Sequence, residues 1–517
     1  MTENRLNIPF LNSPFIEKMA LTIAILSTGI VFLDQSGVNV ALPAIQKSLN
    51  ADIGALQWIL DIYLLVLSIL MLIGGVLGDI FGRVRVYIIG MVIFIAASVL
   101  CGLAPTTGWL IMGRFLQGVG GSLVAPGGLA IINAVVAPER RGRMLGIWGT
   151  FAPLITIAGP VIGGWLVDFA SWRAVFYINL PLGLLAIFIA WRFVPESRNE
   201  TIDGRLDWLG LFTLMVGLGG VLISLIEGPN LGWANPWILL SITAGVIGLA
   251  AFVWIESWVP APLIPLHLFK IPEFTGVNLM TVILYFGLGG PFFFITLNLQ
   301  QIQGYTASQA GLAIMPITIV LFLMARKTGA LTDRWGARPL IIIANLLIAL
   351  SFAMLMWPSL DQPYWTHWLP GIIVYGIGLG FLIVPITSLG LQALPQNQSG
   401  TASGVNNAAS RLGQMLSIAI LGAVMTNRFR SGMINRIAEL ELSADVRTQL
   451  LLQARSLGET IPPAGLSPET TAAIEQAIRL SFVDGFRTNM FISAVLVLAS
   501  LGILLATIPK GKVASES

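Results

Sequence analysis

The chain has 517 residues, of which 56% are hydrophobic and only 10% are charged. Because soluble domains carry about 25% charged residues, this composition excludes a chain built of soluble domains and indicates an integral membrane protein. The formal net charge is +3, but the basic residues lie at the ends of apolar runs rather than in one patch, which does not indicate a nucleic-acid partner.

Apolar runs long enough to span a bilayer, which takes about 20 residues, recur along the chain. The first six are predicted at 19–42, 56–78, 84–104, 109–135, 144–167 and 175–193. The first run lacks a convincing small-residue cleavage site, so it is interpreted as an uncleaved span and not as a signal peptide.

Two more runs, at 206–226 and 236–258, follow a charged stretch at 196–207 and precede a proline-rich segment at 260–272. They are interpreted as an inserted pair. Six final runs are predicted at 274–299, 309–331, 339–357, 368–391, 401–425 and 485–508. The total of about fourteen runs predicts an all-α integral membrane fold.

The runs predict three parts: an N-terminal six-helix bundle at 1–195, an inserted helix pair with its flanking loops at 196–272, and a C-terminal six-helix bundle at 273–517. An internal repeat supports the two bundles, because the segment 75–83 after the second run is echoed by 329–337 after the tenth. Many secondary transporters built from such repeats place their substrate site between the two halves, near the bilayer midplane.

Basic residues predict the orientation of the chain. Those near the run ends that a count of fourteen places on one side include Arg83, Arg85, Arg140, Lys270 and Arg338. Because positively charged loops stay in the cytoplasm, both termini are predicted to be cytoplasmic, in the inner (cytoplasmic) membrane of the cell.

The long connection at 427–484 is then predicted to lie outside. Helix-start signals at Ser443 and at 467–469 predict an ordered helical hairpin there. Its role stays open between a gate, a site for a periplasmic or membrane partner, and a cap or spacer over the outer face, of which the last is favoured.

Charged side chains inside the runs are candidate functional groups, because each costs about 2.5 to 3.5 kcal/mol on insertion scales. Asp34 lies eight residues from the outer end of its run, which is about 12 Å deep at 1.5 Å per residue. Asp61 and Arg114 each lie five residues from the outer ends of theirs, or about 8 Å deep, so the three can meet at one level. An Asp34–Arg114 contact is the favoured proton-coupling site, and a permanent structural pair is the alternative.

Asp61 shares a helix face with Gln57 and Trp58 at spacings of four and three residues, which suits a cavity wall that holds a cation. Trp58 and Tyr63 are candidates for cation–π contacts with such a substrate. The alternative for these aromatic residues is an anchor at the membrane surface.

The second bundle adds three candidate substrate contacts, Asn278, Asn407 and Arg411. For Arg411 a structural link to carbonyls or amides is the favoured alternative. No acid lies within the central runs of this bundle, so the charge chemistry is predicted to differ between the two halves.

The sequence offers no support for enzyme, ATP-driven or cofactor chemistry. It contains no GxxxxGK[ST] nucleotide-binding motif and no recognisable nucleophile–base pair. One cysteine excludes an internal disulfide, and two separated histidines make no metal site. The protein is therefore predicted not to be an enzyme, to need no metal or cofactor, and to draw its energy from a proton gradient.

Glycines and several short motifs complete the pattern, since small residues in spans permit close helix packing. The motif-bearing segments are 33–34 with 38–43, 75–85, 113–118, 159–164, 172–173, 179–183 and 207–210. They resemble the major facilitator superfamily, in particular its fourteen-span drug:proton antiporters of the EmrB/QacA type, over nearly the whole chain.

The resemblance implies the major facilitator fold, with two six-helix bundles plus two inserted helices. It also implies that Arg114 takes part in proton coupling, that Asp79 and Arg83 latch the cytoplasmic side, and that 159–164 forms a proton-tight bundle interface. The residues assigned in this way to conformational motifs are Gly75, Asp79, Gly82, Arg83, Arg85, Gly159, Pro160, Gly163, Gly164, Asp333, Gly336 and Arg338.

The predicted function is a proton-coupled efflux antiporter that exports lipophilic, cationic or neutral drug-like compounds across the cytoplasmic membrane. The alternative is a proton-coupled exporter of a specific metabolite, lipid or siderophore, and a more remote one is a non-transporting membrane sensor or scaffold. The expected partners are a small-molecule substrate and the lipid bilayer.

Overall fold

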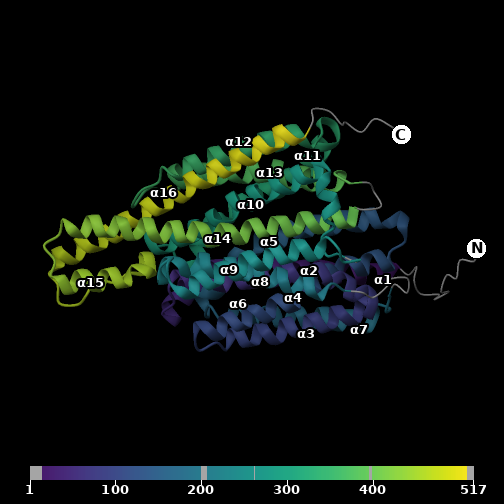
Figure 1. Cartoon of the computed structure of the whole chain (residues 1–517), viewed down its shortest axis with the longest axis horizontal. Coiled ribbons are helices and arrows are strands. Elements are labelled where there is room, and N and C mark those ends of the chain that lie inside the picture. Colours follow the sequence, from purple (N-terminus) through teal and green to yellow (C-terminus); the bar gives the residue numbers. More distant parts are fainter. Residues whose placement is uncertain (1–13, 199–205, 261, 395–398, 509–517) are drawn as a thin grey trace, which may run out of the picture.

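The computed structural model describes residues 14–198, 206–260, 262–394 and 399–508. Within these ranges the regular structure is entirely helical, and the long helices run side by side along the long axis of the molecule (Figure 1). Thirteen helical segments there are long and apolar enough to cross a membrane. The predicted all-α integral membrane fold is confirmed.

The first seven helices pack mainly on one another, with α4 lying against α1, α2 and α3. Their bounds are α1 (Pro14–Leu49), α2 (Ile53–Phe81), α3 (Arg83–Gly102), α4 (Thr107–Val135), α5 (Pro138–Phe169), α6 (Ala174–Tyr177) and α7 (Asn179–Phe193).

Several helices extend well beyond the predicted runs. α1 reaches from Pro14 to Leu49, whereas the apolar run covers 19–42. A run of high hydropathy marks only the part that lies in hydrocarbon, and the helix continues into the polar flanks. The start of α2 is set by Asp52, whose side chain accepts a hydrogen bond from the N–H of Ala55 at 2.8 Å.

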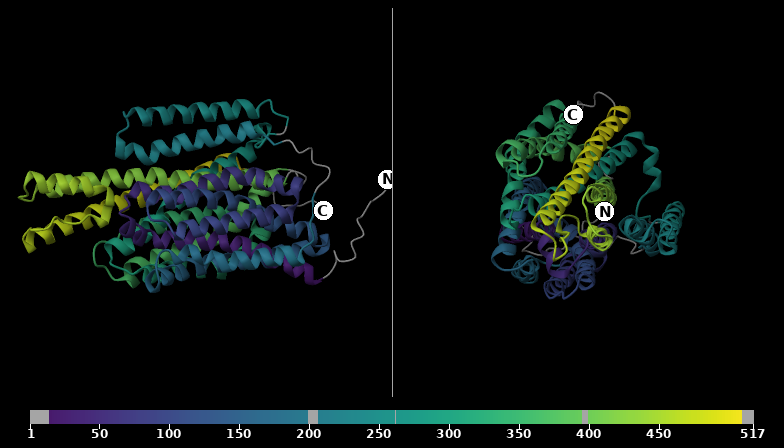
Figure 2. Two further views of the ribbon diagram at one scale, coloured as in Figure 1. Left: turned by 90° about the horizontal axis from the view of Figure 1, so that it is seen from below. Right: turned by 90° about the vertical axis from the view of Figure 1, so that its left-hand side faces the viewer.

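The inserted pair consists of α8 (Trp208–Leu231) and α9 (Pro236–Glu256), which pack on each other at one side of the molecule (Figure 2). α8 also contacts α2 and α14, so the pair lies beside the line where the two halves meet. Residues 199–205, in the predicted charged stretch before α8, lie outside the described residues.

The remaining helices form the second group, in which α10 packs against α14 and α16 and α13 packs against α11 and α12. Their bounds are η1 (Leu266–Lys270), α10 (Pro272–Leu297), η2 (Asn298–Ile302), α11 (Ala307–Trp335), α12 (Ala337–Leu355), η3 (Tyr364–Trp368), α13 (Leu369–Gln392), α14 (Ser399–Ala438), α15 (Ala444–Gln453), η5 (Ala454–Glu459) and α16 (Pro468–Thr507).

The predicted hairpin is ordered and helical, but it is not a separate element. α14 continues to Ala438 and α16 begins at Pro468, so both helices project beyond the rest of the molecule and carry α15 between them (Figure 1). The two predicted helix starts are confirmed, since the side chains of Ser443 and Ser467 accept hydrogen bonds from backbone N–H groups three residues on. We call this end of the molecule the hairpin end.

α1 begins and α16 ends at the opposite end, which we call the terminal end (Figure 1). An even number of spans places both of these helix ends on one side of the membrane, so a fourteenth span beside the thirteen apolar helices fits this arrangement. α5 runs alongside α1 and α11 and is the available helix. The count of fourteen and the exact domain boundaries stay predictions.

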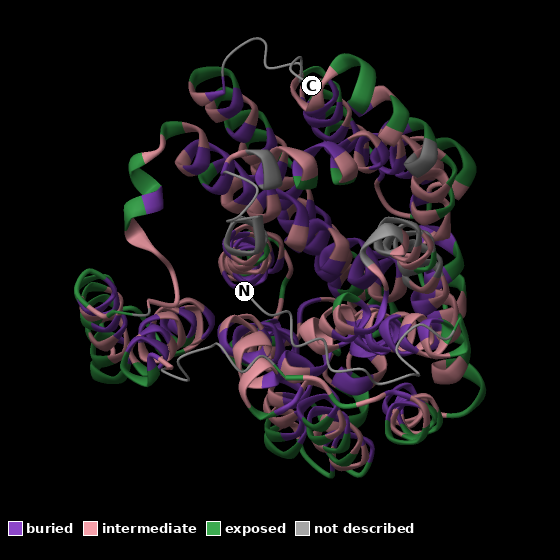
Figure 3. Ribbon diagram, turned by 90° about the vertical axis from the view of Figure 1, so that its right-hand side faces the viewer, coloured by how far each residue is buried: buried purple, intermediate pink, exposed green. Residues whose placement is uncertain are grey.

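The two groups of helices meet along two lines of contact, α5 against α11 and α2 against α14. Seen from the terminal end, buried residues lie toward the middle and exposed ones around the rim, as expected for a body surrounded by lipid (Figure 3). The buried polar side chains on the facing helices are therefore the candidates for function.

Candidate functional site

Asp34, near the middle of α1, forms an ion pair with Arg114 of α4. Nη1 of Arg114 lies 2.5 Å from Oδ2 of Asp34, and both side chains are completely buried. The other carboxylate oxygen, Oδ1, accepts hydrogen bonds from Gln117 at 3.1 Å and from Asn179 at 2.8 Å. The predicted Asp34–Arg114 contact exists, and its carboxylate is held by three donors.

Arg114 is held by several neighbours besides Asp34. Its Nε donates to the carbonyl of Ile59 at 3.0 Å, and Nη1 also donates to Oε1 of Gln117 at 2.8 Å. The guanidinium lies 4.2 Å from the centre of the Tyr63 ring, a cation–π distance. Its Nη2 is buried and has no hydrogen-bond partner among the described residues. Burial of an ion pair costs several kcal/mol, which such bonds offset.

Ser98 of α3 completes the network, because its hydroxyl accepts from Gln117 at 2.8 Å and from Asn179 at 3.3 Å. Sequence reasoning did not select these three residues. Gln117 and Asn179 lie in motif-bearing segments, but uncharged polar residues are common in spans, and only the fold shows that they point at Asp34. Four helices, α1, α3, α4 and α7, thus fix one carboxylate.

Asp61 does not join this network. It is completely buried, and neither of its carboxylate oxygens has a hydrogen-bond partner in the part of the chain that is described. The reason is the helix face. The Tyr63 ring of α2 lies against Arg114, whereas Asp61 lies one turn after Gln57, whose side chain points to α14. The depth of Asp61 in the membrane was predicted from the sequence, but the helix toward which its side chain points was not.

The other candidates on α2 have partners of their own. Nε2 of Gln57 donates to the carbonyl of Ile418 in α14 at 2.6 Å, which joins the two groups of helices. Nε1 of Trp58 donates to Oε1 of Glu227 in the inserted α8 at 2.8 Å. Gln57, Trp58 and Tyr63 therefore point toward three different helices, and their predicted substrate contacts stay predictions.

In the second half, Asn278 of α10 is buried and donates to the carbonyl of Phe274 at 2.8 Å. Asn407 is exposed, one turn before Arg411 on α14. Nη1 of Arg411 lies 3.4 Å from Oε1 of Gln35, the residue after Asp34 in α1. Arg411 thus reaches across to the first half close to the ion pair, and its role toward substrate stays a prediction.

The motif after the second span forms a tight turn at the terminal end. Asp79 and Arg83 pair at 2.8 Å within one helical turn, and Gly82 between α2 and α3 has a φ of 108°, which favours glycine. Glu196, beyond α7, accepts from the N–H groups of Val84 at 3.0 Å and Arg85 at 2.9 Å. Glu196 caps α3, a role that its sequence position did not reveal.

The repeat of this motif lies at the same end of the second half. Gly336 separates α11 from α12 with a φ of 79°, as Gly82 does in the first half. Asp333 is exposed, and Nη2 of Arg338 lies 3.3 Å from the carbonyl of Leu505 in α16. Gly75, in the first copy of the motif, has open space where a Cβ atom would lie, so no close contact there requires glycine.

The small residues of α5 allow this helix to pack closely on α1 and α11. A Cβ atom at Gly163 would lie 2.6 Å from Cα of Gly37 in α1, and one at Gly164 would lie 2.5 Å from the carbonyl oxygen of Ala307 in α11. Both distances are shorter than non-bonded atoms allow. On the same helix, Gly159 packs on Ser36, and the carbonyl of Pro160 packs on Gly311.

Several hydrogen bonds join the two halves near the hairpin end. Asp168, at the end of α5, accepts from the backbone N–H groups of Ala307 at 3.2 Å and Ser308 at 2.8 Å. From η2, Gln300 donates to the carbonyl of Val40 at 2.9 Å. With the Gln57–Ile418 bond, these contacts hold the halves together at this end.

Comparisons with known proteins agree with this architecture. Residues 24–418 match the model of the Major Facilitator Superfamily. The chain is similar to the multidrug resistance protein Stp of Mycobacterium tuberculosis, with 30% identity over 483 residues that cover 91% of this chain and 89% of Stp. It is similar to the tetracenomycin C resistance and export protein of Streptomyces glaucescens, with 29% identity over 92% of this chain and 89% of that protein. It is also similar to the multidrug transporter protein MdtP of Bacillus subtilis, with 30% identity over 90% of this chain and 88% of MdtP.

Solved structures show the same fold. The D-xylose–proton symporter superposes with a TM-score of 0.64 at 14% identity, over 98% of this chain and 100% of the symporter. A bacterial homologue of the human lysosomal transporter Spinster superposes with a TM-score of 0.63 at 18% identity, over 96% of this chain and 97% of the homologue. The chain therefore belongs to the Major Facilitator Superfamily and is a membrane transporter.

Proposed function

We propose that this transporter is a proton-coupled efflux antiporter that exports lipophilic, cationic or neutral drug-like compounds across the cytoplasmic membrane. Export of drugs is supported by the names of the relatives Stp and MdtP. Coupling to protons is supported above all by the completely buried Asp34–Arg114 pair, because a charge in the middle of a spanning helix is seldom retained without a function.

Protonation of Asp34 is the proposed switch. A proton on the carboxylate removes the charge that holds Arg114, and breaking a buried pair of this kind costs about 3–5 kcal/mol unless new partners form. Arg114 then keeps only the neutral acceptors Gln117 and the Ile59 carbonyl, which favours a movement of α4 relative to α1 toward a new acceptor. A free-energy difference of that size changes the ratio of two conformations on the order of 10²- to 10³-fold.

The bonds at the hairpin end give the switch a direction. With both termini in the cytoplasm, the hairpin end faces the outside. The bonds from Asp168 to the start of α11 and from Gln57 to α14 then close the described conformation on that side. Asp61 lies one turn from Gln57 on the same face, so it becomes accessible when α2 and α14 separate. We assign it to the positively charged part of the cargo, and Asp34 to the proton.

A narrower cargo is the second candidate function. The relative that is named for tetracenomycin C resistance and export carries the name of a single compound, which favours an exporter of one defined metabolite. The same coupling site serves either cargo, so the two candidates differ only in the range of substrates.

The experiment is transport by the purified protein in proteoliposomes, driven by an imposed pH gradient. The panel contains lipophilic cations, neutral lipophilic compounds and single natural products. Export of several unrelated lipophilic compounds supports the first candidate, and export of one compound alone supports the second. Transport that is indifferent to the pH gradient would show that the proposed coupling is wrong.

A further inference from the structure

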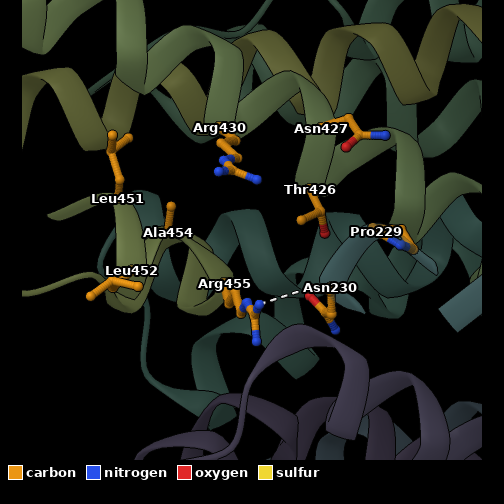
Figure 4. Close-up of a pocket in the computed structure, with 9 residues that line it drawn as sticks. All are labelled: Pro229, Asn230, Thr426, Asn427, Arg430, Leu451, Leu452, Ala454 and Arg455. Atoms are coloured by element: carbon orange, nitrogen blue, oxygen red, sulfur yellow. Dashed lines mark hydrogen bonds between the residues drawn. The ribbon is translucent and has the colours of Figure 1, made fainter. Parts of the chain in front are cut away.

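A small cavity lies at the hairpin end, where three elements far apart in the sequence meet (Figure 4). The end of α8 contributes Pro229 and Asn230, α14 contributes Asn427 and Arg430, and the segment from α15 to η5 contributes Leu452 and Arg455. The cavity has a volume of about 80 Å³. It joins the inserted pair to the projecting hairpin, and neither feature has a place in the transport mechanism described above.

The lining of this cavity is rich in hydrogen-bond donors and positive charge. Two arginines and two asparagines line it, and no aspartate or glutamate is among the lining residues. Nη2 of Arg455 donates to the backbone carbonyl of Asn230 at 2.8 Å, which fixes this side chain at the cavity wall. Arg430 has no hydrogen bond or ion pair with another described residue. Such a lining selects an anion, and planar guanidinium groups suit a phosphate in particular.

Aromatic residues place the cavity at the level of lipid headgroups. Asn230 is the second-last residue of α8. Trp233 lies in the connection from α8 to α9 and Trp237 in the first turn of α9, and they are 47% and 73% exposed. Exposed tryptophans at the ends of spans mark the boundary between headgroups and hydrocarbon. α9 faces lipid as well, since only 28% of the residues in its most apolar stretch are buried inside the protein.

Apolar side chains beside the arginines favour a lipid over a free anion. Leu452 lines the cavity and is 73% exposed, and Leu231, next to Asn230, is 50% exposed. A phosphate ion in water gains nothing from such neighbours, whereas the glycerol and first acyl carbons of a phospholipid cover them.

We propose that this cavity binds the phosphate group of an anionic phospholipid from the leaflet at the hairpin end. Arg430 and Arg455 pair with the phosphate, Asn230 and Asn427 supply further donors, and the leucines contact the upper acyl chains. The lipid links the inserted pair to α14 and to the hairpin. This gives the hairpin a membrane partner, and the inference does not depend on the cargo or on proton coupling.

The test uses the full chain in nanodiscs of mixed phosphatidylglycerol and phosphatidylcholine, with native mass spectrometry to count retained lipids. The wild type is expected to retain phosphatidylglycerol, and Arg430→Gln with Arg455→Gln is expected to weaken this retention about tenfold. Arg428→Gln is the matched control, because Arg428 is an exposed arginine of α14 that does not line the cavity. Retention in this control should equal that of the wild type.

Two further measurements separate a lipid site from a folding defect and from a site for free phosphate. Replacing both arginines by lysine keeps the charge and is expected to preserve most of the phosphatidylglycerol, which shows that the loss in the glutamine variant is not a folding defect. Inorganic phosphate at millimolar concentration is expected not to displace the lipid. Equal retention by the wild type and the double glutamine variant, an equal loss in the Arg428→Gln control, or full displacement by phosphate would each overturn the lipid site.

Discussion

Asp168 at the end of α5 caps the first turn of α11, with its Oδ2 atom 2.8 Å from the backbone nitrogen of Ser308. The contact links one half of the transporter to the other through a carboxylate and the positive end of a helix dipole. It lies where the close packing of α5 on α11 ends. In the proposed outward-closed conformation, cap and packing together hold the two halves against each other at the hairpin end.

Replacing Asp168 by Ala is expected to loosen this closure. The change removes both acceptors for the N–H groups of Ala307 and Ser308. Exposed charge-assisted bonds contribute up to about 1 kcal/mol, so the population open at the hairpin end should rise about fivefold. The measurement is the distance distribution between spin labels on the hairpin ends of α5 and α11, in a background that lacks Cys101.

Asp361→Ala is the control for this variant. Asp361 pairs with Arg479 at 2.7 Å, also near the hairpin end, but both residues belong to the second half. Its removal should leave the α5–α11 distances unchanged. Identical distributions for Asp168→Ala and the wild type would contradict a closing role for Asp168.

Gly163→Ala is expected to destabilise the protein by about 1–3 kcal/mol and to reduce transport, because the added Cβ overpacks α5 against Gly37. A Cβ atom added at Gly502 of α16 meets open space. The free energy of unfolding of Gly502→Ala should therefore stay within about 0.5 kcal/mol of the wild type, or rise through the helix propensity of alanine. Thermal unfolding and transport are measured for both. Equal behaviour of the two variants would show that the α1–α5 contact tolerates a side chain.

The hairpin predicts a pH effect on stability at Glu459. Burial raises the pKa of the Glu459 carboxyl, and Lys47 partly offsets this. Because the folded pKa lies above the ordinary one, the stabilising contribution is full below the ordinary value of 4.5 and is lost as the pH rises through the folded value. Glu459→Gln should therefore raise the unfolding temperature at pH 8 more than at pH 4.5. The exposed Glu441→Gln serves as control, and a change that is the same at both pH values would refute the expectation.

Asp61→Asn is expected to reduce the export of cationic substrates about tenfold while neutral substrates keep most of their rate, since only a cation loses a charge-assisted contact. Initial rates for one cation and one neutral compound of similar size are compared in the same proteoliposomes. An equal reduction for both compounds would remove Asp61 from selectivity.

Much of the fold follows from the sequence, because hydropathy alone locates most of the spans and the serines at 443 and 467 locate helix starts. The continuation of α14 to Ala438, beyond its predicted run at 401–425, was not predicted, since a helix continues past the apolar run when tertiary contacts support it. The same limit applies to Asp168, the first residue after a predicted run. Nothing in the local sequence says that its partner is the start of α11.

The candidate site was predicted in part. The depth of Asp34 and Arg114 was sufficient to predict their contact, because charged side chains at similar depth on neighbouring spans find each other. The same argument did not hold for Asp61, because depth in the membrane does not determine on which face of its helix a residue lies. Gln117 and Asn179 were missed because an amide in a span carries no charge that demands a partner.

The central claim is that Asp34 couples transport to protons, and Asp34→Asn tests it most directly. The variant keeps the size of the side chain and leaves Arg114 without its counter-charge. Substrate export driven by a pH gradient in proteoliposomes should be abolished, while substrate exchange without a gradient persists. Full gradient-driven export by Asp34→Asn would contradict the claim.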